Sequence, residues 1–355
     1  MIPAILRHAT LRHSALIAAA LAITSMSAPA MAQTPRANGE TVGIQNYAST
    51  TGNMHAIVAK EKGFCEKYNF KCEIKTINST SLGLQALVGK TIDFTQGGAD
   101  LVGAAVVAGA DVVIVGTSLP ANVLSVSVRN DVPLPNRPKG YPAIMQDFKG
   151  KRIGVAARGT SSEKYFNAML KDGGLKPEDV TYVAIGAPNT GYTALAIGKQ
   201  IDAIIMYQPL TQLCQFNKTC ETVIDMTVGE GPKSLAATIG ANVIFAARRE
   251  MAESNPKLME AFYAAMKDAA DWFNDPKNFE ELVKIYTPII SFGDMAGADD
   301  MRRAWIKSVI PAYSKDLKVK VSALQEIMDF SYENKIIDVK VDAKKVLWDK
   351  APQTP

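Results

Sequence analysis

The sequence predicts an α/β fold of two lobes, each a mainly parallel sheet flanked by helices, with a helical C-terminal tail. Two stretches of the chain show the same alternation of apolar strand-like runs and amphipathic helices, and a proline-rich segment separates them. Alternation at this spacing places helices on both faces of parallel sheets. With 355 residues, the chain is long enough for two domain-sized cores.

The first stretch contains seven alternating elements, four strands and three helices, and a linker lies after it. We expect strands at 41–47, 71–78, 91–98 and 111–119, and helices at 54–64, 81–90 and 99–109. A further apolar strand covers 122–131, and the segment 131–142 that follows holds four prolines and a glycine, which is typical of a linker.

The second stretch restarts the pattern and ends in a run of helices. Strands are expected at 151–157, 180–187, 201–208 and 221–227, and helices at 161–174 and 190–200, with a loop between Cys214 and Cys220. A second extended crossing covers 240–250, and helices follow at 254–275, 279–287, 298–313, 322–335 and 342–350. Two crossings predict a discontinuous first lobe, made of residues 33–129 and 240–355, with 130–239 as the second lobe.

The first 32 residues have the pattern of a signal peptide. Arg7 and Arg12 precede the apolar run LIAAALAITSM, and APAMA ends in the small-x-small pattern of a cleavage site. We expect export to the periplasm with cleavage after Ala32. The alternative is a membrane anchor, which the short apolar run and the lack of stop-transfer flanks disfavour.

The four cysteines form two local pairs, Cys65 with Cys72 and Cys214 with Cys220. Export permits disulfides, and each bridge would close a loop worth about 2.5 kcal/mol in the chain-entropy model. The alternative is a four-cysteine metal site. Neither spacing fits the C-x₂₋₄-C pairs of such a site, so no metal is expected.

Charge and histidine content exclude several functions. Removing the two arginines of the signal segment from the 39 basic residues leaves 37, against 35 acidic ones. The near balance, without a run of like charges, argues against nucleic-acid binding. His55 is the single histidine after the signal segment, so a Ser–His–Asp or Cys–His catalytic site would have to use it. We expect His55 to be a packed or surface residue instead. In GAPNTGY, Tyr192 stands where a P-loop needs lysine.

Polar loops recur at the carboxyl ends of the predicted strands. They are QNYASTTGN, NSTS, GGAD and TSLPAN in the first stretch, and ARGTSS, GAPNTG and YQP in the second. Ligands of open α/β sheets bind at such ends, facing helix N-termini. In GVAARGTSSEK, Ser161 or Ser162 is expected to cap a helix, and Arg158 adds donors for a small anion. The plain alternative is a capped helix with one surface arginine.

With these loops in place, the sequence resembles exported solute-binding proteins of ABC importers, in the family that binds nitrate, sulfonates, taurine and thiamine precursors. The resemblance covers roughly residues 40–290. It is carried by VGIQNYASTTGNMHAIVAKEKGF, LVGKTIDF, FKGKRIGVAARGTSSEKYF, LKPEDVTYVAIG and IGKQIDAIIMYQP. It implies the type II periplasmic-binding-protein fold, hinge closure on a small ligand, delivery to an ABC permease, and neither catalysis nor a cofactor.

The resemblance also implies a set of ligand-binding residues. In the first lobe these are Asn46, Tyr47, Ser49, Thr50, Ser79, Thr80, Ser81, Gly97, Gly98 and Asp100; in the second they are Arg158, Gly159, Thr160, Ser161, Ser162, Asn189 and Tyr207. Arg158 would bind the anionic group of a sulfonate or carboxylate, and Asp100 would bind a ligand amine. Tyr47, Tyr192 or Tyr207 would stack on a ring.

The implied protein is a monomer without nucleic-acid partners, and no cysteine follows the cleavage site to carry a lipid anchor. The resemblance leaves other functions open. The ligand could be an aminopyrimidine precursor of thiamine, or the chain could be a synthesis-type enzyme of the same fold. That enzyme would need a histidine in the site and a metal-binding cysteine. A periplasmic sensor or adaptor would have the same fold.

Overall fold

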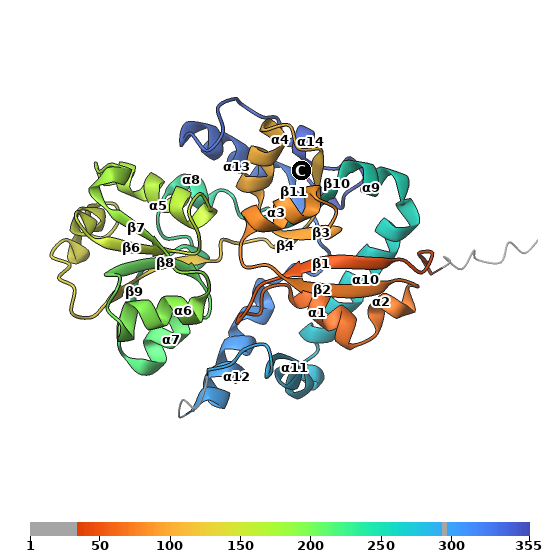
Figure 1. Ribbon diagram of the computed structural model, residues 1–355, viewed down its shortest axis with the longest axis horizontal. Helices are drawn as coiled ribbons and strands as arrows, with labels where there is room; N and C mark the ends of the chain where they lie inside the picture. The colour runs from red at the N-terminus through yellow and green to blue at the C-terminus, as the bar shows by residue number, and fades with distance from the viewer. Residues whose placement is uncertain (1–33, 293–296) are drawn as a thin grey trace, which may run out of the picture. The chain divides into compact units, whose positions relative to one another are not determined.

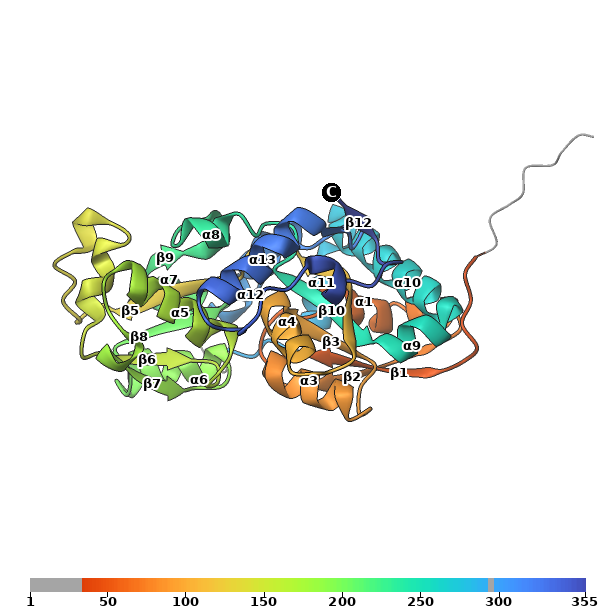
Figure 2. The same cartoon turned by 90° about the horizontal axis from the view of Figure 1, so that it is seen from above.

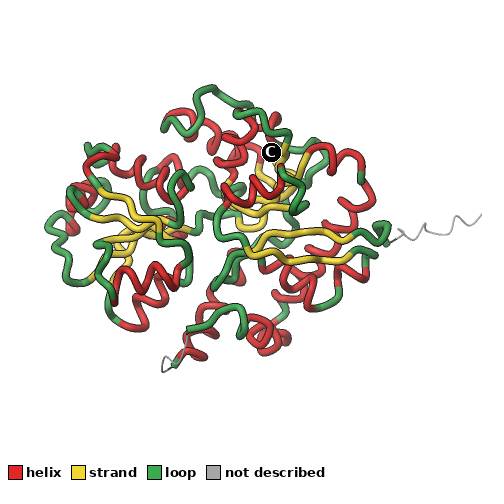
Figure 3. Tube along the Cα trace, in the orientation of Figure 1, coloured by secondary structure: helices red, strands yellow, loops and turns green. Residues whose placement is uncertain are grey.

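A computed structural model describes residues 34–292 and 297–355. From Pro35 onward the described residues form one compact unit, which contains two five-stranded sheets and a small two-stranded one (Figures 1 and 3). Within these ranges, no helix has the length and apolar character needed to cross a membrane. The predicted signal segment and its cleavage after Ala32 lie outside the described residues.

The first sheet has the strand order β2-β1-β3-β10-β4. Its strands are β1 (Thr41–Asn46), β2 (Lys71–Thr76), β3 (Phe94–Gly98), β4 (Val112–Leu119) and β10 (Val243–Arg248). Strands β1, β2 and β3 pair in parallel, whereas β10 runs antiparallel to both β3 and β4. Strand β10 arrives from the other sheet, and its reversed direction makes the sheet mixed.

The second sheet has the order β7-β6-β8-β5-β9 and mirrors this arrangement. Its strands are β5 (Leu124–Arg129), β6 (Arg152–Val155), β7 (Thr181–Ala184), β8 (Ala203–Tyr207) and β9 (Cys220–Asp225). Strand β5 is antiparallel to β8 and β9, and β6 pairs in parallel with β7 and β8. Residues 124–129 therefore lie in the second sheet, although the sequence assigned them to the first lobe. An apolar run read alone does not show which sheet it joins.

Helices flank both sheets. They are α1 (Met54–Glu61), α2 (Phe64–Lys67), α3 (Thr80–Val88), α4 (Ala99–Val107), α5 (Ser161–Asp172), α6 (Pro188–Tyr192), α7 (Leu210–Asn217), α8 (Lys233–Ala236), α9 (Arg249–Ser254), α10 (Pro256–Asn274), α11 (Phe279–Tyr286), α12 (Ala298–Val309), α13 (Val321–Glu333) and α14 (Ala343–Val346). A π-helical turn at 193–197 continues α6. The C-terminal helices return to the first sheet, where α13 packs against α4 (Figure 2). The small sheet pairs β11 (Val319–Lys320) with β12 (Gln353–Thr354).

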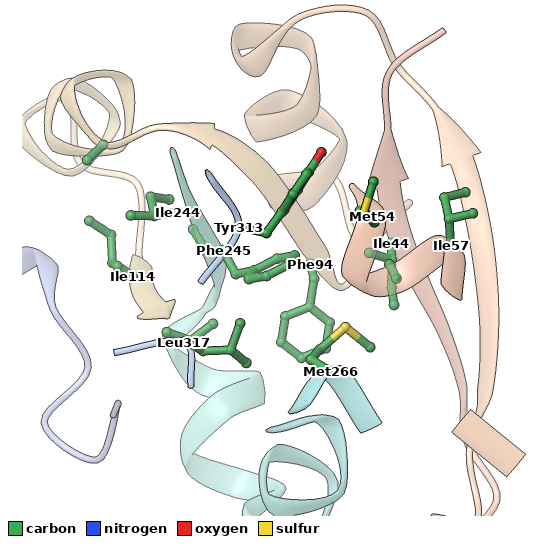
Figure 4. Close-up of a cluster of buried hydrophobic side chains, with 14 of the residues drawn as sticks. Ile44, Met54, Ile57, Phe94, Ile114, Ile244, Phe245, Met266, Tyr313 and Leu317 are labelled. Carbon is green, nitrogen blue, oxygen red and sulfur yellow. The ribbon is translucent and has the colours of Figure 1, made fainter. Parts of the chain in front are cut away.

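The core under the first sheet forms because α10 presents apolar residues at helical spacing. Phe94 of β3 stacks flat on Phe262 of α10, with ring centroids 3.9 Å apart. Phe245 of β10 meets Phe262 edge-on at 5.5 Å. Figure 4 shows Phe94 and Phe245 together with Ile44 of β1 and Met266 of α10, all of them buried. The strand from the second crossing thus shares its core with the N-terminal strands.

Both predicted disulfides are confirmed. Cys65 in α2 bonds Cys72 in β2, and Cys214 in α7 bonds Cys220 at the start of β9. The segment before Cys220, expected to be a loop, is the helix α7. It begins directly after Pro209, so the turn signal in YQP marked the start of a helix instead of a longer connection.

Candidate functional site

A cavity of about 640 Å³ lies where polar loops from both sheets meet. Its walls come from the carboxyl ends of β1, β3, β4 and β8 and from the first turns of α3 and α5. Ten of the predicted site residues line it: Tyr47, Thr50, Ser79, Thr80, Gly97, Gly98, Thr160, Ser161, Ser162 and Tyr207. Six of the seven predicted strand-end loops therefore converge, whereas GAPNTG contributes no residue to the lining.

On the side of the first sheet, hydrogen bonds fix the cavity wall. The Tyr47 hydroxyl donates to the carbonyl oxygen of Gln96 at 2.6 Å and lies 3.1 Å from Thr80 Oγ1. Burial raises the pKa of Tyr47 to about 12, so the phenol stays a neutral donor. A Cβ on Gly97 would lie 2.2 Å from the Thr80 side chain, so only glycine allows this close approach.

On the side of the second sheet, the wall is the first turn of α5. The N-cap residue is Thr160, one position before the two serines expected to cap this helix. Thr160 Oγ1 donates to the carbonyl oxygen of Ala157 at 2.7 Å instead of accepting from the helix, which leaves α5 without a side-chain cap. The chain turns here through Gly159, whose φ of 75° is left-handed.

Four contacts join the parts of the chain that border the cavity. The Ser161 hydroxyl donates to Asp100 Oδ1 at 2.9 Å, and the Thr50 hydroxyl donates to the carbonyl oxygen of Gln208 at 3.1 Å. Tyr47 and Tyr207, from β1 and β8, face each other edge-on with ring centroids 6.0 Å apart. Asn189 Nδ2 donates to the carbonyl oxygen of Ser291 at 2.8 Å. Apolar packing also joins the two halves, because Phe330 of α13 lies in the core of the second sheet and meets Tyr165 of α5 edge-on at 5.5 Å.

Asp100 lies directly behind the cavity wall. It is fully buried, and its Oδ2 has no hydrogen-bond partner among the described residues. Burial raises the pKa of Asp100 to about 6 against the smaller lowering effect of the Ser161 hydroxyl. No cationic group contributes to this shift. The carboxyl is therefore an unpaired acidic group next to two lining residues, Gly98 and Ser161.

Arg158 does not line the cavity. Its guanidinium donates twice to the Glu163 carboxylate, at 3.0 Å each, and lies over the ring of Tyr182 at 5.4 Å. The Glu163 hydrogen bond is the largest cause of the raised pKa of Arg158. Glu163 lies only five residues after Arg158 and is therefore a local partner for the guanidinium. The sequence analysis did not predict this ion pair.

Other predicted residues also lie outside the cavity lining. These are Asn46, Ser49, Gly159 and Asn189, with Ser81 one position past the lining at α3. Asn46 accepts a hydrogen bond from the Asn53 backbone at 3.1 Å and so shapes the loop after β1. Tyr192, considered for stacking, is buried and its hydroxyl lies 3.0 Å from Thr219 Oγ1.

Several lining residues were missed by the sequence analysis. The largest group consists of Gln208, in the turn after β8, and Gln212 and Gln215 of α7, which all line the cavity. We call these three glutamines the amide wall. Gln212 and Gln215 have helical spacing, but the sequence analysis ended a strand at Gln208 and expected a loop between Cys214 and Cys220. Asn122, Asn242, Tyr165 and Tyr313 are among the other polar residues of the lining.

His55 lies in the core of the first sheet and does not line the cavity. His55 Nε2 lies 2.7 Å from the carbonyl oxygen of Ser314, and the ring packs against Phe245, Phe273 and Tyr313. Burial lowers the pKa of His55 to about 4, so the ring is a neutral core residue, as expected. Among the described residues no group of three or more His, Cys, Asp or Glu side chains is placed to hold a metal ion.

Comparisons with known proteins agree with this architecture. A family model described as NMT1/THI5 like matches residues 51–278. A curated relative from Brucella abortus, named as a binding protein, is 26% identical over 65% of this chain, and the match spans 66% of that relative, just under two thirds of its length. A Bacillus subtilis relative, named as an aliphatic sulfonates-binding protein, is 25% identical over 86% of this chain and 84% of its own.

Solved structures share the fold. The periplasmic aliphatic sulphonate binding protein SsuA from Escherichia coli aligns with a TM-score of 0.62 at 21% identity, covering 89% of this chain and 94% of that one. At so low an identity, the similarity is evidence for the fold and not for the ligand. It shows that the two mixed sheets form the periplasmic-binding-protein fold.

Proposed function

Because the chain belongs to the NMT1/THI5-like family, we propose that it is the solute-binding component of an ABC importer, which captures a small organic ligand and delivers it to a permease. The observation that carries this proposal is the cavity of about 640 Å³, whose lining is drawn from the strand ends of both sheets. A volume of this size suits a small metabolite. The binding proteins among the relatives support the same role.

We propose that the two sheets with their helices act as two lobes. The chain passes between them at the segments before β5 and β10, and the contacts across the cavity are few. A ligand that touches both walls would stabilise the closed arrangement by its differential affinity for it. We also propose that the protein acts in the periplasm as a monomer, after residues 1–32 have been removed.

The expectation of an anionic ligand, a sulfonate or a carboxylate, rested on Arg158. That side chain pairs with Glu163 outside the cavity, so an anion would depend on backbone N–H groups at the first turn of α5. The Bacillus subtilis relative, by its name, supports sulfonates as one class to be tested.

Catalysis has no support in the described site. The enzyme alternative requires a histidine in the cavity and a metal-binding cysteine, whereas His55 is in the core and all four cysteines are in disulfides. We therefore propose binding and release as the function of the cavity.

A thermal-shift screen of small metabolites tests the proposal. A true ligand at one hundred times its dissociation constant stabilises the folded protein by about 2.7 kcal/mol. Small-angle X-ray scattering of each hit should show a smaller radius of gyration, since closure brings the lobes together. A complete absence of stabilising compounds, in a screen that includes sulfonates, carboxylates, nitrate and aminopyrimidines, would contradict the proposed function.

A further inference from the structure

The charge of the cavity limits the ligands it can hold. Among the described residues that line it there is no lysine, arginine or histidine. The single charged residue in that lining is Asp225, and the Asp100 carboxyl lies behind Gly98 and Ser161. The side chains that line the cavity therefore supply negative charge and no positive charge, and Arg158 is paired with Glu163 outside the lining.

The helix end that could attract an anion already faces two carboxylates. At the first turn of α5, the Ser161 hydroxyl is engaged by Asp100, and the Gly159 backbone N–H donates to Glu163 at 2.6 Å. The partial positive charge of a helix N-terminus is about half an elementary charge. The Asp100 carboxylate offsets part of that charge, and the Glu163 carboxylate is itself paired with Arg158, so this turn brings no full positive charge to the cavity.

Buried polar atoms without partners gather at the cavity. Seven such side-chain atoms occur in the described chain, and four of them lie here: Tyr207 OH, Gln208 Oε1, Gln212 Oε1 and Asp100 Oδ2. Two of these belong to the amide wall, and the carboxylate oxygen can only accept. Buried polar groups normally have a partner, so this cluster indicates where a ligand makes its hydrogen bonds.

From this site, we propose that the ligand of the cavity carries no net negative charge and donates N–H or O–H groups to Gln208, Gln212 and Tyr207. A sulfonate, nitrate or carboxylate group offers acceptors only. With the glutamine amides oriented as they are in this structure, such a group leaves the glutamine oxygens unpaired, and each unpaired buried oxygen weakens binding by about tenfold. An uncharged amide or a protonated amine satisfies the same oxygens. The inference rests on the proposed function, since it concerns the ligand of that same cavity.

Probe pairs of similar shape, in which one member is neutral with N–H donors and the other is an anion with acceptors only, test the inference on the full mature protein. We would compare benzamide with benzoate, benzenesulfonamide with benzenesulfonate, and nicotinamide with nicotinate at pH 7.5, and run the metabolite screen with hits sorted by charge. The expected result is that stabilising compounds are uncharged or cationic, and that each anionic partner binds at least tenfold more weakly.

Three variants connect any hit to the amide wall. Gln212→Leu should weaken binding by about tenfold or more, because it removes the acceptor. Gln212→Glu keeps an acceptor of the same shape and should retain binding of an N–H-donating hit. The control is Gln200→Leu, since Gln200 is an exposed glutamine before β8 that does not line the cavity, and it should bind as the wild type.

The possible results distinguish a failure of the inference about ligand charge from a failure of the proposed solute-binding function. If the hits are anions and Gln212→Leu binds them as the wild type does, the inference is overturned while the solute-binding function stands. If Gln212→Leu and Gln212→Glu both keep wild-type affinity for an uncharged hit, the role of Gln212 is overturned. If no compound of any charge binds, the proposed function fails and the inference fails with it.

Discussion

The hydroxyl of Ser161 donates a hydrogen bond of 2.9 Å to a carboxylate oxygen of Asp100, and this bond joins the first turn of α5 to the first turn of α4. The two helices follow strands of different sheets. Asp100 is fully buried, so the bond ties the two sheets together around a carboxyl that no cation neutralises.

Replacing Asp100 should therefore change how stability depends on pH. Burial raises the pKa of Asp100 to about 6, so the folded chain binds this proton more tightly than the unfolded chain, and Asp100 favours folding more as the pH falls from 6 towards 4. We expect Asp100→Asn to raise the free energy of unfolding by about 1–3 kcal/mol at pH 8 and to have little effect at pH 4. Denaturant unfolding at both pH values measures this, and a variant less stable than the wild type at pH 8 would refute it.

Tyr207→Phe should weaken ligand binding without destabilising the empty protein. The Tyr207 hydroxyl is buried without a partner in the described chain, so its removal is expected to leave the free energy of unfolding unchanged or to raise it by up to about 1 kcal/mol. Affinity for a screened hit should fall about fivefold or more.

Tyr47→Phe is the matched control, because that hydroxyl has protein partners. It should lower the free energy of unfolding by about 1–2 kcal/mol. Titration calorimetry and thermal unfolding of both variants check the pair, and equal stability losses in the two would contradict the assignment.

Arg158→Ala should leave ligand affinity nearly unchanged. The family resemblance implied that Arg158 binds the anionic group of the ligand, whereas the structure places the guanidinium outside the cavity, on Glu163 and Tyr182. The Arg158 side chain is 62% exposed, so solvent screens the ion pair and the expected stability loss is about 0.5 kcal/mol. A loss of binding of one hundredfold in calorimetry would restore the original assignment.

The two disulfides should differ in their effect on binding. In the chain-entropy model, removing either local bridge by paired Cys→Ser substitution costs about 2.5 kcal/mol of stability. Cys214 lies in α7, between Gln212 and Gln215, whereas Cys65 and Cys72 lie away from the cavity lining. We expect the variant lacking Cys214 and Cys220 to bind more weakly, and the variant lacking Cys65 and Cys72 to bind normally. Equal affinities in the two would show that α7 keeps its place without its bridge.

Much of the architecture could be predicted because periodicity is a property of the local sequence. The strands of both halves, the long helix α10 beginning at Pro256, and both disulfides agree with the expectation. Six of the seven polar loops also converge, because parallel strands end at one edge of a sheet.

What could not be predicted depends on contacts between residues or on the neighbouring strand. Arg158 forms an ion pair with Glu163 outside the cavity. The spacing of residues in the sequence does not show whether an arginine binds such a local carboxylate or a ligand. Strand β5 joins the second sheet, although its residues alone fit either. The amide wall was missed because a short helix between a proline and a cysteine looks like a connection.

The strand order also bears on how the chain folds as it is synthesised. The second sheet takes all its strands from residues 124–225, an uninterrupted run. The first sheet lacks the strand between β3 and β4 until residues 243–248 have been made. Nascent domains generally fold in order from the N-terminus. In this chain, however, all strands of the second sheet are synthesised before the first sheet is complete. More than a hundred residues separate β3 and β4 from β10, the strand that lies between them.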